Sequence, residues 1–211
     1  WIMVDIGVTF ADDTLLWIYL IYPDPGFIVD KKEDLLGIVL THAHEDHIGA
    51  IAHLWPQLKC KIFATPFTAL LIKEKFKEKR IDVTSYLKIV QLNGSVNLDP
   101  FKIEYITLTH SILEPNGLRI ETPAGITLHT GDWKIDAEPL IGDKINSDRL
   151  KESGKEGVVA MIGEATNVYR MGKSGTELDG RKSMLKMMSS VKKRIKKRYF
   201  ESNVERMETE V

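Results

Sequence analysis

The sequence has a single cysteine, no long apolar run and almost no net charge. Because Cys60 has no second cysteine to pair with, an internal disulfide framework is excluded, which is typical of a reducing compartment such as the cytoplasm. No stretch approaches the ~18 uninterrupted apolar residues that a membrane span needs, and no signal peptide is recognisable, so we expect no membrane association. The formal net charge is −1 and hydrophobic residues make up 43% of the 211 residues, as in globular proteins with a substantial core.

The first residues have the pattern of a strand already in progress. The chain opens with Trp1 instead of Met, and Ile2 to Val8 is an apolar run interrupted by Asp5. Since a domain rarely begins inside a core strand, we expect an upstream part of the domain to be missing. An acid in a core strand is costly unless it is paired, so we expect Asp5 to orient a metal-binding histidine; an edge-strand acid that faces water is the alternative.

The densest group of chemically active side chains follows the apolar run 37–40. It has the register HxHxDH, formed by His42, His44, Asp46 and His47. A strand ending in a tight loop would direct the first two histidines to the same side, because side chains at i and i+2 share a face. Neutral imidazole and carboxylate are ligands of Zn²⁺ and similar ions. A solvated polar turn is the alternative, but four potential ligands in this register favour a metal site.

Strand and helix patterns alternate along the rest of the chain. Residues 10–25 read as a loop, and the later patterns predict a helix over 48–58 ended by Pro56, a strand over 61–64, a helix from Pro66 to Lys79, strands over 87–92 and 101–108, a hairpin over 118–129 and a strand over 158–162.

Polar residues follow three of these later strands, namely His110, Asp132 and Glu164. Loops at the ends of packed strands commonly converge, so we expect these residues to join the histidine loop in one site. His53, on a predicted helix, and His129, just before the Gly-Asp turn, are expected to be structural.

Four segments together resemble the ribonuclease J branch of the β-CASP nucleases, within the metallo-β-lactamase superfamily. They are IMVDIG at 2–7, LTHAHEDHIGA at 40–50, THS at 109–111 and HTGDWKID at 129–136. The resemblance implies an α/β fold, an αββα sandwich of two packed sheets with helices outside, here incomplete. It also implies a metallo-β-lactamase domain over residues 1–175 without its N-terminal strands, and a basic helix with the start of a β-CASP domain over 176–211.

The resemblance further implies a centre with two divalent metal ions, with Zn²⁺ expected and Mn²⁺ or Mg²⁺ as alternatives. His42, His44 and His110 would hold one ion, Asp46 and His47 the second, and Asp132 would bridge both. The implied catalytic residues are Asp46, His47, Asp132 and Glu164. In place of the branch's SDSTN, this chain has Gly-Glu-Ala-Thr-Asn at 163–167, so the acid is present as Glu164 but two hydroxyl side chains are absent.

The C-terminal part is strongly basic. Nine Lys or Arg and no acid lie between Arg181 and Arg198, while Met184, Met188, Val191 and Ile195 follow helical spacing. This pattern favours an amphipathic helix with a solvated basic face over a phosphate-contacting surface, because no aromatic residues are interleaved for base stacking. Residues 199–206 resemble the start of the β-CASP domain, whose later histidines are not encoded here, so we expect the chain to be cut at both ends.

Three functions remain open from the sequence. The resemblance implies a metal-dependent ribonuclease acting on RNA in a bacterial cytoplasm, working as a homo-oligomer or with a partner fragment that supplies the missing domain. A thioester or lactone hydrolase on the same scaffold is the second hypothesis, since HxHxDH alone does not separate the two. The third is a non-catalytic, metal-binding remnant of a split gene. We expect this chain by itself to show little RNA turnover.

Overall fold

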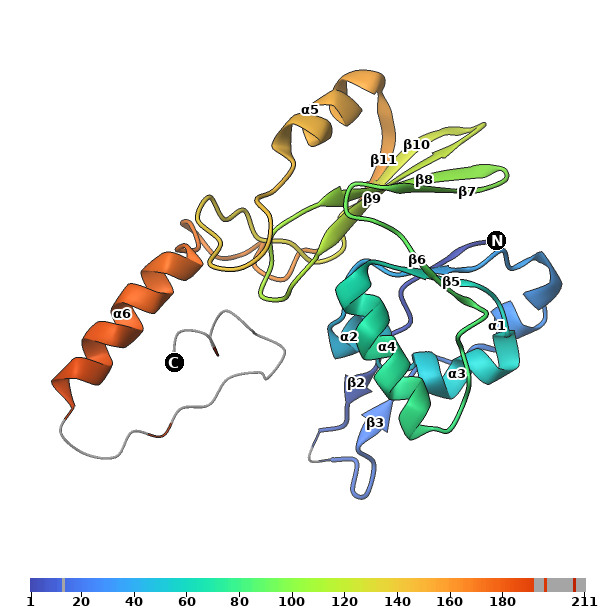
Figure 1. Ribbon diagram of the computed structural model, residues 1–211, viewed down its shortest axis with the longest axis horizontal. Helices are drawn as coiled ribbons and strands as arrows, with labels where there is room; N and C mark the ends of the chain where they lie inside the picture. Colours follow the sequence, from blue (N-terminus) through green and yellow to red (C-terminus); the bar gives the residue numbers. More distant parts are fainter. Residues whose placement is uncertain (13, 192–195, 197–206, 208–211) are drawn as a thin grey trace. The chain divides into compact units, whose positions relative to one another are not determined.

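The structure, a computed structural model, describes residues 1–12, 14–191, 196 and 207 (Figure 1). It divides into two compact units, residues 1–103 and 104–211, each of which is described by itself. Within the described ranges, no helix is both long enough and apolar enough to cross a membrane.

A four-stranded parallel sheet forms the centre of the first unit. Its strands are, in spatial order, β1 (Met3–Val4), β4 (Ile38–Val39), β5 (Ile62–Ala64) and β6 (Leu87–Ile89). Strands β4 and β5 consist of buried apolar residues, as expected for a parallel sheet that is covered on both faces.

The helices of this unit pack on the sheet and on one another. Helix α4 (Pro66–Glu78) contacts β5 and β6 and packs against α3 (Ile51–Leu58), which in turn contacts the short helix α1 (Gly26–Val29) (Figure 1). Ile72 and Phe76 of α4 are fully buried, and the ring of Phe76 meets that of Trp55 edge-on at 5.4 Å. The predicted strand over 61–64 and the predicted helix from Pro66 are confirmed.

Three predictions for the first unit are wrong in whole or in part. Strand β1 stops at Val4 because Asp5 adopts a left-handed conformation with φ 60°, which a strand does not accommodate. The predicted helix over 48–58 is present as α3 and ends at Leu58 as expected, but it begins at Ile51 and Pro56 lies inside it, since burial of Trp55 and Leu58 outweighs the loss of one backbone hydrogen bond.

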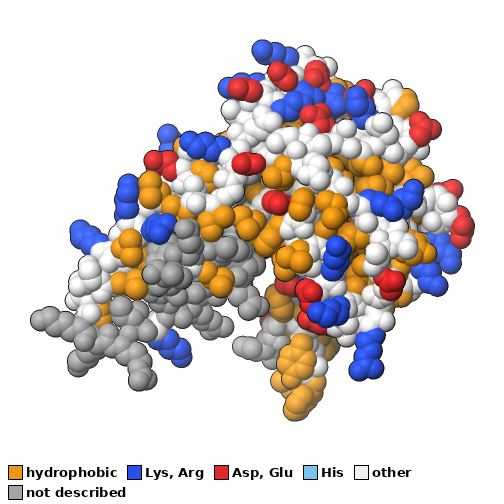
Figure 2. Space-filling view, viewed as in Figure 1, with side chains coloured by type: hydrophobic (Ala, Val, Ile, Leu, Met, Phe, Trp, Pro, Cys, Tyr) orange, Lys and Arg blue, Asp and Glu red, His pale blue; other side chains and the backbone are white. Residues whose placement is uncertain are grey.

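The third error concerns residues 10–25, which are not all loop. Strands β2 (Thr9–Phe10) and β3 (Leu20–Ile21) pair as an antiparallel hairpin. Hydrophobic side chains gather at its exposed end (Figure 2), among them Leu16, Trp17 and Tyr19, of which Trp17 is 89% exposed. Both strands are exposed, so the segment lacks the alternation of apolar and polar residues by which a half-buried strand is recognised in a sequence.

The second sheet has five strands in the order β11-β10-β9-β8-β7. They are β11 (Val158–Ile162), β10 (Gly125–His129), β9 (Asn116–Thr122), β8 (Phe101–Thr107) and β7 (Ser95–Leu98). Strand β7 and the first residues of β8 belong to the first unit, which ends at residue 103. The hairpin over 118–129 is confirmed, with Gly125 opposite Thr122, and the predicted strands over 101–108 and 158–162 are also present.

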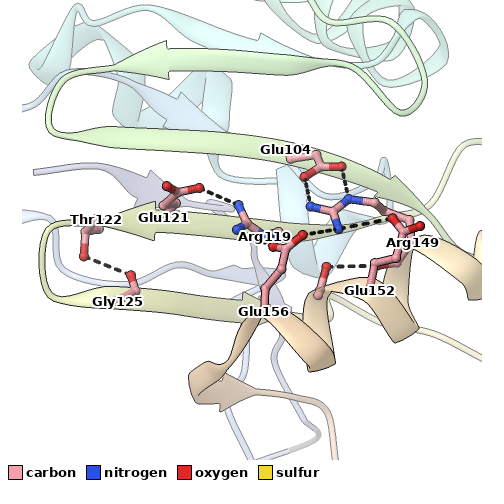
Figure 3. Close-up of polar contacts among 9 residues, drawn as sticks. Glu104, Arg119, Glu121, Thr122, Gly125, Arg149, Glu152 and Glu156 are labelled. Atoms are coloured by element: carbon pink, nitrogen blue, oxygen red, sulfur yellow. Dashed lines mark hydrogen bonds and ion pairs between the residues drawn. The ribbon is translucent and has the colours of Figure 1, made fainter.

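Helix α5 (Ser147–Glu156) contacts β11 and is joined to the sheet by a network of charged side chains (Figure 3). Arg149 binds Glu104 through two hydrogen bonds of 2.6 and 2.8 Å, and also binds Glu156 at 2.8 Å. Glu156 in turn pairs with Arg119 at 2.6 Å, and Arg119 is only 5% exposed. The network therefore anchors both ends of a helix that has little apolar surface of its own.

The last described helix is α6 (Glu177–Ser190), which begins with a capping box formed by Thr176 and Asp179. Backbone and side-chain contacts of Glu177 with Asp136 and Lys134 attach its first turn to the segment after β10.

The predicted helical spacing is present at Met184 and Met188, but the helix ends before Val191, which is extended. Ile195, most of the basic run and residues 199–206 lie outside the described residues, so the division at residue 175 stays a prediction.

Candidate metal centre

The histidine loop connects β4 to the short helix α2 (Glu45–Ile48). Thr41 and His42 are fully buried directly after the buried strand, and His44 remains extended as the residue that precedes α2. Nε2 of His42 lies 3.1 Å from Nδ1 of His44, and the rings of His42 and His47 have centroids 4.0 Å apart. The first unit thus brings three of the predicted metal ligands together.

Asp5 contacts this group directly, as predicted. Its Oδ2 lies 2.7 Å from Nδ1 of His47, and both side chains are largely buried, at 12% and 14% exposed. The alternative of an edge acid facing water is therefore wrong. Because Nδ1 of His47 donates to the carboxylate, Nε2 is the ring nitrogen with a lone pair for a ligand.

Asp46 is the most exposed of the four HxHxDH residues that were predicted as ligands. Its carboxylate is 66% exposed, and Oδ2 lies 3.8 Å from Nε2 of His47. An exposed carboxylate next to an imidazole nitrogen can reach a common ion or accept a proton from a nearby water molecule.

The second unit brings His110 and Asp132 together. Nε2 of His110 lies 4.0 Å from Oδ2 of Asp132, and the side chains are 20% and 26% exposed. Their loops are joined through Thr109, whose backbone oxygen accepts from the Lys134 amide at 2.7 Å and whose hydroxyl accepts from the Asp136 amide at 3.2 Å. The role of Thr109 was not predicted.

Glu164 follows β11 in the same unit. Strands β10 and β11 are parallel, so the segments that follow them, which carry Asp132 and Glu164, leave the same edge of the sheet. The Glu164 carboxylate is exposed and accepts a hydrogen bond from the hydroxyl of Thr166 at 2.9 Å.

The two remaining histidines, His53 and His129, make contacts typical of structural residues. His53 on α3 stacks on Tyr22 with ring centroids 5.5 Å apart, and burial lowers the pKa of its imidazole. Nδ1 of His129 accepts a hydrogen bond from the backbone amide of Gly131 at 3.1 Å.

The donor set of the histidine loop fits a divalent metal ion. Two ligands of a tetrahedral Zn²⁺ with metal–nitrogen distances of about 2.0–2.1 Å stand roughly 3.3 Å apart. The separation of 3.1 Å between His42 Nε2 and His44 Nδ1 is close to this value, and the carboxylate behind His47 is the usual support of a metal-binding imidazole. His42 and His44 could therefore provide two of the ligands of such an ion.

Comparison with known families identifies the class of protein. A model of the metallo-beta-lactamase superfamily matches residues 1–157, and the chain belongs to that superfamily, which confirms the predicted α/β fold class. A crystal structure of a protein of unknown function from Enterococcus faecalis V583 is similar with a TM-score of 0.60 and 18% identity, covering 82% of this chain and 43% of that chain. This likeness shows the fold alone.

The resemblance to ribonuclease J is confirmed by curated relatives that carry this name. The chain is 39% identical over 209 residues to ribonuclease J of Sinorhizobium meliloti, covering 98% of this chain and 37% of the relative. It is 34% identical over 209 residues to ribonuclease J of Helicobacter pylori, with 98% and 30% covered, and 38% identical over 216 residues to that of Corynebacterium glutamicum, with 100% and 29% covered. The chain thus spans 29–37% of the length of these relatives.

Proposed function

We propose that the chain is the metal-binding part of a metal-dependent hydrolase of the ribonuclease J type, which hydrolyses phosphodiester bonds of RNA. The observation that carries this proposal is the close grouping of His42, His44 and His47, together with the hydrogen bond between Nδ1 of His47 and the largely buried carboxylate of Asp5. The family match and the relatives named ribonuclease J support the same conclusion.

We assign the ligands as the resemblance to ribonuclease J implies. His42, His44 and His110 would hold one divalent ion, Asp46 and His47 a second, and Asp132 would bridge both because a carboxylate has two oxygens. Zn²⁺ is the ion we expect, because it favours nitrogen-rich sites. We also propose that the protein acts in the cytoplasm.

A pair of divalent ions held by these residues would lower the pKa of a water molecule that attacks phosphorus and would offset the negative charge on the phosphate. The residues of this chain have separate tasks. Asp5 holds the ring of His47 in one orientation. We propose that Asp46, whose carboxylate is exposed, accepts a proton and that Glu164 is a further acid that sets up the site.

The metal assignment is tested by measuring bound zinc in the purified chain and in single variants. We expect His44→Ala and His110→Ala each to lose most of the bound metal, while the matched control His53→Ala, on α3 and stacked on Tyr22, retains it. Equal zinc content in all four proteins would contradict the ligand assignment.

The reaction is tested by incubating the zinc-loaded chain with 5′-monophosphorylated RNA and, separately, with a thioester. RNA cleavage that Asp46→Ala abolishes would support the nuclease. Thioester turnover alone would support the second hydrolase hypothesis, and no turnover of either substrate would be the result expected of a chain that needs a partner or has only a metal-binding role.

A further inference from the structure

The hydroxyl of Thr41 lies between two side chains of the candidate metal centre. Its Oγ1 is 2.8 Å from Oδ2 of Asp5 and 3.0 Å from Nδ1 of His42. The backbone amide of Thr41 also donates to Oδ1 of Asp5 at 2.8 Å. Thr41 and His42 are both fully buried, so these contacts are shielded from competition with water.

The direction of the two hydrogen bonds follows from the number of protons available. A hydroxyl has one hydrogen, and an ionised carboxylate only accepts. The hydrogen of Thr41 therefore points to Asp5, and its oxygen must accept a hydrogen from Nδ1 of His42. This fixes the His42 tautomer with the proton on Nδ1 and the lone pair on Nε2.

We infer that Thr41 is a positioning residue that transmits the orientation set by Asp5 to His42, so that Nε2 of His42 is kept ready to bind a metal ion. The inference rests on the proposed metal-dependent function. One carboxylate then orients two imidazoles, His47 directly at 2.7 Å and His42 through the Thr41 hydroxyl. The nitrogen that this tautomer leaves unprotonated, Nε2 of His42, is the one that lies 3.1 Å from Nδ1 of His44.

A pair of substitutions separates the hydroxyl from the bulk of the side chain. Thr41→Val keeps the shape and removes the hydroxyl, whereas Thr41→Ser keeps the hydroxyl and removes the methyl group. Loss of a hydrogen bond behind a metal-binding histidine weakens metal affinity by about ten- to hundredfold. We expect that loss for Thr41→Val, and affinity within about threefold of the original for Thr41→Ser, measured with Zn²⁺ alone in competition with a chelator.

The tautomer itself has a spectroscopic signature that needs no metal. Nitrogen-15 spectra of the metal-free chain should show a protonated Nδ1 and an unprotonated Nε2 for His42, and Thr41→Val should mix the two tautomers. A protonated Nε2 in the original chain would overturn the inference, as would equal zinc affinity of Thr41→Val and the original, or equal weakening by both substitutions.

Failure of the proposed function gives a different result. In that case the original chain binds zinc no better than His44→Ala, whereas the His42 tautomer is still observed and still decides the role of Thr41. If Thr41→Val does not fold, the spectrum of the original chain and the affinity of Thr41→Ser remain decisive.

Discussion

A Cβ atom built on Gly7 would lie 1.7 Å from the backbone oxygen of Asp46, so this glycine allows the chain after β1 to touch the histidine loop. The two segments are already joined by backbone hydrogen bonds from Ile6 to His47 and from Val8 to Glu45, of 2.7 and 3.1 Å. Any side chain at residue 7 must displace backbone, because no flexible group is there to move.

Gly7→Ala is therefore expected to destabilise the chain by roughly 1–3 kcal/mol, as is typical of overpacking, and to lower zinc affinity by shifting the histidine loop. Thermal unfolding and zinc titration measure the two effects. Gly154→Ala on α5 is the matched control, because a Cβ there would meet nothing within 4 Å and alanine is the better helix former. A Gly7→Ala variant as stable as Gly154→Ala would show that the contact is not as tight as described.

The charged network of Figure 3 gives a second prediction. Glu104→Gln removes the charge from a partner that binds Arg149 through two hydrogen bonds, and we expect a loss of about 1–2 kcal/mol in the free energy of unfolding. Lys151→Gln breaks an exposed pair with Asp148 on the same helix and should cost less than about 0.5 kcal/mol. Denaturant unfolding of both variants checks the difference, which equal values would contradict.

Cys60 should react slowly with alkylating reagents in the folded chain. Burial raises the pKa of its thiol to about 11 from 9.0, so at neutral pH the reactive thiolate is roughly a hundredfold less populated than in the unfolded chain. Labelling at pH 8 with and without denaturant measures this difference. Because the folded chain keeps the thiol protonated up to a higher pH than the unfolded chain, the contribution of Cys60 to the free energy of unfolding is present below pH 9 and is lost as the pH rises toward 11.

Substitution by phenylalanine should destabilise the chain at Trp55 and have little effect at Trp17. The indole of Trp55 is buried and donates to the backbone oxygen of Cys60 at 2.8 Å, so Trp55→Phe loses that bond and some packing, at about 1–3 kcal/mol. Trp17 is 89% exposed, and Trp17→Phe should change stability by less than about 0.5 kcal/mol. A large loss of stability on changing Trp17 would mean that the hairpin packs against something in solution.

Elements with strong local signals were predictable from the sequence. Helix α4 begins at Pro66, and the hairpin of β9 and β10 has its turn at Pro123 and Ala124, because proline and turn residues act within a few positions of the chain. The end of β1 was not predictable, since it depends on the left-handed backbone of Asp5, which is stabilised by contacts with Thr41 and His47 far along the chain.

The sequence alone indicated a metal-binding site, because imidazoles and carboxylates in the HxHxDH register are a property of residue type and spacing. It also indicated that Asp5 needed a partner, since a charge in an apolar run must be compensated. Only the tertiary structure decided that the partner is His47, and that Thr41 connects the same carboxylate to His42. The contacts of Asp5 with Thr41 and His47 join residues 36 and 42 positions apart, so they depend on three-dimensional placement that no local pattern encodes.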